Sequence, residues 1–147
     1  MNRLGLCRMN DADALSVLHD KIRRMADDMG APADLIPTID GSDGNGRPQI
    51  EFDGRLFHYV VAERGQELKR ISSRLEDEIL FQAFRSIADE LGARHSAAYR
   101  VAGQDFRRAM FGKQVELLRS ISVRWAERAA CENARVLTEY PFEDSAE

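Results

Sequence analysis

Residues 49–72 limit the possible fold of this chain most strongly, because apolar and polar side chains alternate there with a period of two. Such alternation is typical of β-strands that bury one face. The dipeptide Asp53-Gly54 interrupts it and is a strong signal for a hairpin turn, and Gly65 interrupts it again. We therefore expect an antiparallel meander of three strands, at Gln49–Phe52, Leu56–Ala62 and Glu67–Ser72.

An amphipathic helix precedes the meander. Apolar residues recur at spacings of three and four from about Asp11 to Met29, and Gly30 then ends the pattern. The next segment, residues 31–48, is rich in glycine and proline, so we expect no regular structure in it.

Three further helices are expected after the meander. Ser73 and Glu76 form the pattern of a capping box at the start of the first one. Gly103 separates it from the second helix, Ser122 separates the second from the third, and Pro141 ends the third. The predicted core lies where the sheet meets the helices and contains Phe57, Tyr59, Val61, Leu80, Phe84, Phe106, Met110 and Trp125.

These patterns predict an α+β fold, with an N-terminal helix, a three-stranded antiparallel meander, and three C-terminal helices packed on the sheet. A chain of 147 residues with 44% hydrophobic and 31% charged residues suits one globular domain over residues 1–147. The sequence has no apolar run of membrane-spanning length, about 20 residues.

A cytoplasmic location is expected for two reasons. The first eight residues are too short and too interrupted to form a signal peptide. Cys7 and Cys131 lie far apart in no metal-binding spacing, which favours two reduced thiols.

The net charge of −4 is unevenly distributed, and both ends of the chain are acidic. No segment is basic enough to indicate a nucleic-acid-binding surface. In the first helix, Asp20, Asp27 and Asp28 lie off the apolar stripe, so we expect them to face water or a basic partner.

Signatures of catalysis are absent from the sequence. It contains no GxSxG motif, no P-loop and no GxGxxG motif, and its histidines do not share the spacing of a zinc-binding helix. We therefore expect no cofactor and no metal. One alternative stays open, a small enzyme that uses Glu63 and His58 as an acid–base pair.

Two polar segments are expected to form a structural cluster. Glu63 and Arg64 end a strand, whereas Asp105, Arg107 and Arg108 begin a helix. Asp105 and Arg108 are three residues apart, a spacing that allows an ion pair on one helix face. We expect Glu63 to pair with Arg107 or Arg108 and to join the sheet to the helices.

Residues 50–142 resemble the immunity protein 63 family of bacterial polymorphic toxin systems. The resemblance rests on four segments: Phe57-His58-Tyr59-Val60-Val61-Ala62-Glu63-Arg64-Gly65, the apolar helix Ile79–Leu91, Gly103-Gln104-Asp105-Phe106-Arg107-Arg108, and Leu137-Thr138-Glu139-Tyr140-Pro141. It implies a non-catalytic α+β protein that binds a cognate toxin domain and neutralises it. Asp20, Asp27 and Asp28 are our candidate contacts for the toxin, because of their position off the apolar stripe of the first helix. A non-catalytic scaffold or regulatory subunit is the other alternative.

Overall fold

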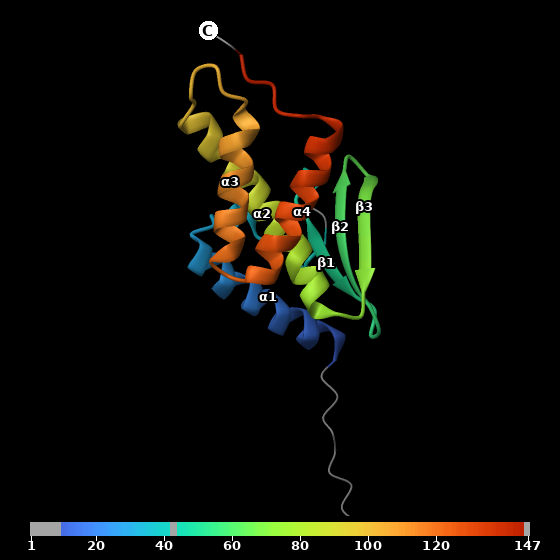
Figure 1. Cartoon of the computed structure of the whole chain (residues 1–147). Coiled ribbons are helices and arrows are strands. Elements are labelled where there is room, and N and C mark those ends of the chain that lie inside the picture. The colour runs from blue at the N-terminus through green and yellow to red at the C-terminus, as the bar shows by residue number, and fades with distance from the viewer. Residues whose placement is uncertain (1–9, 42–43, 146–147) are drawn as a thin grey trace, which may run out of the picture.

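The computed structural model describes residues 10–41 and 44–145, which form four α-helices and a three-stranded sheet (Figure 1). The α+β class and the order of the elements are as predicted. The first eight residues, which include Cys7, lie outside the described ranges. Within those ranges, no helix is long and apolar enough to cross a membrane. In chain order the elements are α1 (Asp11–Met29), the 3-10 turn η1 (Ala33–Leu35), β1 (Gln49–Phe52), β2 (Phe57–Glu63), β3 (Gln66–Ser73), α2 (Glu76–Ala98), α3 (Phe106–Arg119) and α4 (Val123–Glu139).

Helix α1 has the predicted bounds, because both of its ends are capped. The Asn10 side chain accepts a hydrogen bond of 2.7 Å from the backbone N–H of Asp13. At the other end, Gly30 adopts the left-handed conformation with φ of 77°. The segment that follows is not wholly irregular as expected, because residues 33–35 form the η1 turn.

The sheet is an antiparallel meander in the order β1-β2-β3. The Asp53 carboxylate closes the first turn, since it accepts the backbone N–H groups of Arg55 and Leu56 at 2.9 and 2.8 Å. Arg64 and Gly65 make the second turn with φ of 51° and 77°, which are the left-handed values that a tight hairpin needs.

Helix α2 is the central element and separates the sheet from α3 and α4 (Figure 1). On the sheet side, Tyr59 of β2 is buried among apolar residues of α2 and α1. On the other side, the Trp125 ring of α4 stacks on Phe84 with centroids 5.8 Å apart and meets Phe81 edge-on. The three C-terminal helices therefore do not all contact the sheet equally, since α2 carries the main contact.

The predicted core is confirmed for four of its eight residues and wrong for one residue. Tyr59, Leu80, Phe84 and Trp125 are buried, whereas Phe106 is 56% exposed. The remaining three, Phe57, Val61 and Met110, are partly buried. Phe106 escapes burial because it is the first residue of α3, at the end of the molecule where α2 stops.

The predicted capping box at α2 does not form. Leu75 is the N-cap residue, and Ser73 still belongs to β3, where its hydroxyl accepts the Leu75 N–H at 3.0 Å. Gly92 does not interrupt α2. It lets α3 approach closely, because a Cβ at this position would lie 2.9 Å from both Gln114 Cγ and the Met110 carbonyl oxygen.

A polar network that sequence reasoning missed joins the three C-terminal helices. Arg85 of α2 donates to Gln114 of α3 at 3.1 Å and to Asn133 of α4 at 2.7 Å. The Asn133 amide also donates to Gln114, at 3.1 Å. Gln114 and Asn133 are 3% and 6% exposed, so this network lies inside the helical layer.

Candidate functional site

The outward side of α1 carries the acidic residues expected to meet a partner. Asp20, Asp27 and Asp28 are all exposed, and within the described residues none of them forms an ion pair. Asp20 and Asp27 share a shallow hollow of about 540 Å³ with Arg23 and Arg24. Because of these two arginines, the surface is mixed in charge and not purely acidic, as the three aspartates alone had suggested.

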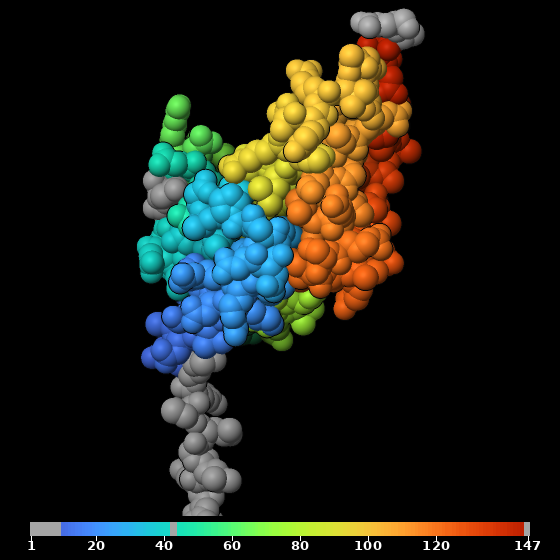
Figure 2. Space-filling model, turned by 90° about the vertical axis from the view of Figure 1, so that its left-hand side faces the viewer, coloured from blue at the N-terminus to red at the C-terminus, as the bar shows by residue number. Residues whose placement is uncertain are grey.

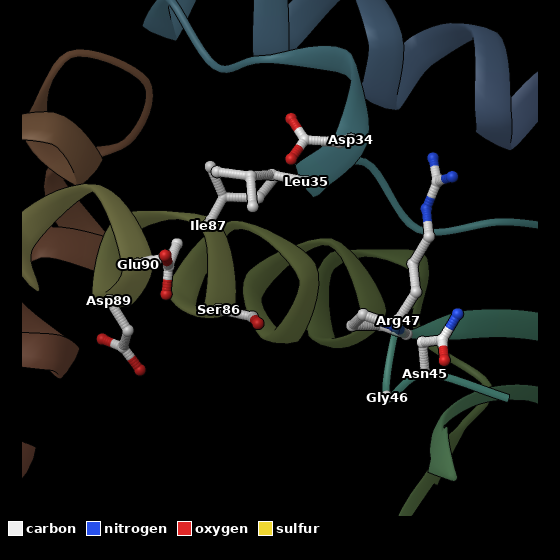
Figure 3. Close-up of a pocket in the computed structure, with 10 residues that line it drawn as sticks. Asp34, Leu35, Asn45, Gly46, Arg47, Ser86, Ile87, Asp89 and Glu90 are labelled. Atoms are coloured by element: carbon white, nitrogen blue, oxygen red, sulfur yellow. The ribbon is translucent and has the colours of Figure 1, made fainter. Parts of the chain in front are cut away.

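A larger hollow of about 560 Å³ lies between α2 and the segment around η1 (Figure 3). Asp34 borders it from η1, and Asp89 and Glu90 border it from α2. Arg47 runs toward η1, where its guanidinium donates to the carbonyl oxygens of Ile36 and Ala33 at 2.8 and 3.2 Å. Arg47 thus holds the segment in place, and its charge offsets part of the negative charge of the carboxylates at this hollow.

Asp89 is an exposed residue at the edge of that hollow, where neighbouring atoms shield part of its carboxylate from water. Burial raises its pKa, an effect that the neighbouring guanidinium of Arg85, 3.1 Å away, opposes. Asp89 and Glu90 pair with Arg85 and Arg94 of the same helix, so Asp34 is the carboxylate at this hollow that forms no ion pair within the described residues.

The structure does not unite Glu63 and His58 as an acid–base pair. The two residues lie five positions apart on β2, and this separation corresponds to roughly 16 Å of extended strand. His58 instead bridges Ser72 Oγ at 2.6 Å and Asp53 Oδ2 at 2.9 Å on the outer face of the sheet.

The contacts among Asp53, His58 and Ser72 have a structural role. The Asp53 carboxylate has a pKa well below its ordinary range, because the Leu56 backbone N–H, the His58 ring and the Arg55 backbone N–H all donate to it. One oxygen of this carboxylate therefore closes the β1–β2 turn, and the other meets the His58 ring. The imidazole ties this turn to β3.

The two predicted polar segments lie at separate places, so the expected pair of Glu63 with Arg107 or Arg108 is wrong. Glu63 is exposed next to the β2–β3 turn, and Arg64 donates its backbone N–H to the Gly44 carbonyl oxygen at 3.4 Å. Both arginines of α3 have closer partners elsewhere.

Asp105 pairs with Arg107 and not, as expected, with Arg108. Asp105 caps α3 by accepting the Arg107 backbone N–H at 2.9 Å, and its other oxygen accepts from the Arg107 guanidinium at 2.8 Å. The Arg107 guanidinium, the Glu143 backbone N–H and the Arg107 backbone N–H hold the pKa of Asp105 well below its usual range.

The C-terminal segment folds back over the start of α3 and supplies the remaining partners. Arg107 donates to the carbonyl oxygens of Tyr140 and Pro141, both at 2.8 Å. Arg108 pairs with Asp144 at 2.7 Å and lies over the Phe142 ring at 4.0 Å. Contacts within the chain therefore define the positions of Asp105, Arg107 and Arg108.

An exposed apolar group lies beside this cluster, where α2 ends and α3 begins. Tyr99, Val101 and Phe106 are 67%, 60% and 56% exposed. We refer to these three residues and Arg100 as the apolar tip. The sequence signal that could have revealed it is the run Tyr99-Arg100-Val101, which places large apolar residues outside a helix just before Gly103.

The fold and these surfaces define a small α+β protein whose exposed charged and apolar groups are suited to contact with another protein. The model of the family described as immunity protein 63 matches residues 53–135, which is more than half of the chain. The chain belongs to this family. Neither the comparison with curated proteins nor that with solved structures finds a match.

Proposed function

We propose that this protein is an immunity protein that binds one cognate toxin domain and neutralises it by stoichiometric contact. Membership of the immunity protein 63 family carries this proposal. In the proposed mechanism, the protein catalyses no reaction and needs no metal or cofactor. It acts in the cytoplasm, where it covers the functional surface of the toxin.

The outward side of α1 is the proposed contact for a basic toxin surface. Asp20, Asp27 and Asp28 support this assignment, because they are exposed and form no ion pairs within the described residues. They outnumber the two arginines of the same surface, Arg23 and Arg24. Unpaired surface charges attract an oppositely charged partner over about one Debye length, roughly 8–10 Å at physiological salt. Their main effect is expected on the rate of association.

Co-expression with the toxin domain encoded by the adjacent gene tests the proposal. The protein should restore growth of cells that make this toxin, and it should not protect against unrelated toxins. With purified components, toxin activity should fall linearly with added protein and end at one equivalent, with or without EDTA.

Two results would overturn the proposal. One is the absence of both protection and binding with the adjacent toxin. The other is loss of toxin activity at a small fraction of one equivalent, because this would require turnover by the protein.

A further inference from the structure

The apolar tip contains three of the large apolar side chains that this fold leaves most exposed. Tyr99 and Val101 follow α2, and Phe106 begins α3. A hollow of about 370 Å³ lies against this tip and is lined by Ala93, Ser96, Ala97, Arg100 and Phe106. Apolar hollows of such size with a few polar groups are typical binding sites.

The tip is held in one conformation by contacts beneath it. Ser96, which is 3% exposed, donates its hydroxyl hydrogen to the Phe106 carbonyl oxygen at 2.7 Å. The Tyr99 ring packs on His95 with centroids 4.8 Å apart. The Gln104 N–H donates to the Val101 carbonyl oxygen and closes the turn between them. Anchors fixed before binding lose less conformational entropy on binding.

Three arginines near the tip are paired with carboxylates, whereas Arg100 is not. Arg94 pairs with Glu90, Arg107 with Asp105, and Arg108 with Asp144. Arg100 has no hydrogen bond or ion pair in residues 10–41 and 44–145, and it borders the apolar hollow. A single free guanidinium beside exposed aromatic rings selects for a carboxylate next to an apolar side chain.

We propose that the apolar tip is a second docking site for the toxin domain. The toxin inserts an apolar side chain against Phe106 and places an Asp or Glu carboxylate on Arg100. Tyrosine and arginine are enriched among the residues that dominate binding energy at protein interfaces, and aromatic residues are enriched at interface cores. This inference rests on the proposed function and adds to it the position and chemistry of an anchor.

Helix α1 and the end of α2 are both visible on one face of the molecule. In Figure 2, α1 (blue) lies at the lower part of the visible face and the end of α2 (yellow) projects at its upper part. A toxin that contacts both would bridge them across the segment around η1 (light blue). Variants at the two contacts can be measured separately.

Binding of the purified, catalytically inactivated toxin domain tests the tip. Phe106→Ser removes the apolar anchor, and Arg100→Glu reverses the free charge. Two matched controls make the same kinds of change at the start of α4: Val123→Ser, at a residue 53% exposed, and Arg124→Glu, at an exposed residue with no ion pair in the described chain.

Calorimetry and kinetic binding measurements should show a clear difference between the two pairs. Phe106→Ser should raise Kd about 30-fold or more, which corresponds to a dominant anchor residue. Arg100→Glu should raise Kd about tenfold or more, and the controls should stay within about twofold. If Phe106→Ser unfolds, Arg100→Glu still carries the test, because Arg100 has no partners within the described fold.

The outcomes separate the inference from the proposed function. If the wild type protects cells and binds toxin while both tip variants bind within twofold of it, the tip inference is overturned and the proposed function stands. If the wild type neither protects nor binds, both are overturned. If the tip variants change the oligomeric state of the free protein and leave toxin binding intact, the tip joins copies of this chain, and the toxin assignment is wrong.

Discussion

Arg85 on α2 donates a hydrogen bond of 2.7 Å to the Asn133 side-chain oxygen on α4, across 48 residues of sequence. With Gln114 between them, these residues fix the relative positions of three helices. A buried polar network of this kind stabilises the fold only while every member keeps its partners.

Asn133→Ala should therefore lower the free energy of unfolding by about 1.5–3 kcal/mol, the range for losing a hydrogen bond to a charged group. Urea denaturation followed by circular dichroism measures this. Arg135→Ala, at an exposed residue of the same helix, is the control and should stay within about 0.5 kcal/mol. Equal midpoints for the two variants would show that the network contributes nothing.

Phe84→Ala tests the centre of the core. Phe84 is 0% exposed and stacks on Trp125, so its truncation removes buried surface and leaves a cavity. The free energy of unfolding should fall by about 3–5 kcal/mol. A loss below about 1 kcal/mol would mean that the surrounding helices collapse into the space, contrary to the packing described.

The two glycines Gly92 and Gly112 form a matched pair within helices α2 and α3. Gly92→Ala places a Cβ 2.9 Å from Gln114 Cγ and the Met110 carbonyl oxygen, so it should destabilise by about 1–3 kcal/mol through overpacking. At Gly112 an added Cβ meets nothing within 4 Å. Gly112→Ala should therefore stabilise by up to about 1 kcal/mol through helix propensity. Thermal and urea melts should move in opposite directions for the two variants.

The carboxylate of Asp105 should make stability depend on pH. Its folded-state pKa is depressed, because the Arg107 guanidinium and then the Glu143 and Arg107 backbone N–H groups donate to it. Its contribution is therefore fully present above its unfolded pKa of about 3.9 and is lost as the pH falls toward the folded value.

Asp105→Asn should lower the melting temperature at pH 7 and should flatten the loss of stability below about pH 4. Melts at pH 7, 4 and 3 for this variant and the wild type measure both effects. An unchanged slope in acid would show that Asp105 does not contribute to the acid sensitivity.

Charge removal on α1 should affect binding and leave folding unchanged. Asp20→Asn with Asp27→Asn should slow association with the toxin and flatten its salt dependence, and adding Asp28→Asn should increase both effects. The matched control, Glu127→Gln with Glu139→Gln, removes two exposed acidic charges from α4.

Glu63→Ala should also leave the melting temperature nearly unchanged, because Glu63 is exposed and does not pair with Arg107 or Arg108.

The elements that could be predicted from the sequence are those whose signals are local. Helix α1 has a cap at each end and a regular apolar stripe, and the β1–β2 turn has Asp53-Gly54. The ends of this helix and this turn are each specified by residues only a few positions apart in the sequence. The Ser73–Glu76 pattern failed because β3 continues to Ser73, and strand pairing with Phe57 prevailed over the local capping preference.

The contacts of the candidate site could not be predicted, because they connect distant parts of the chain. Arg108 pairs with Asp144 only because the segment after α4 returns across the start of α3. Phe106 fits an apolar period, but its exposure depends on where α2 ends. Sequence spacing carries no information on either arrangement.

The shared region of the family, residues 53–135, excludes α1 and β1, although Ile22 and Ile50 lie in the same core as Tyr59 and Phe84. A fragment cut to residues 53–135 would keep two strands and leave part of that core open to water, so we expect it to be less stable than the whole chain. Helix α1 is therefore tied to the matched region through its inward side, where Ile22 lies in the common core, whereas Asp20 and Asp27 on its outward side are exposed.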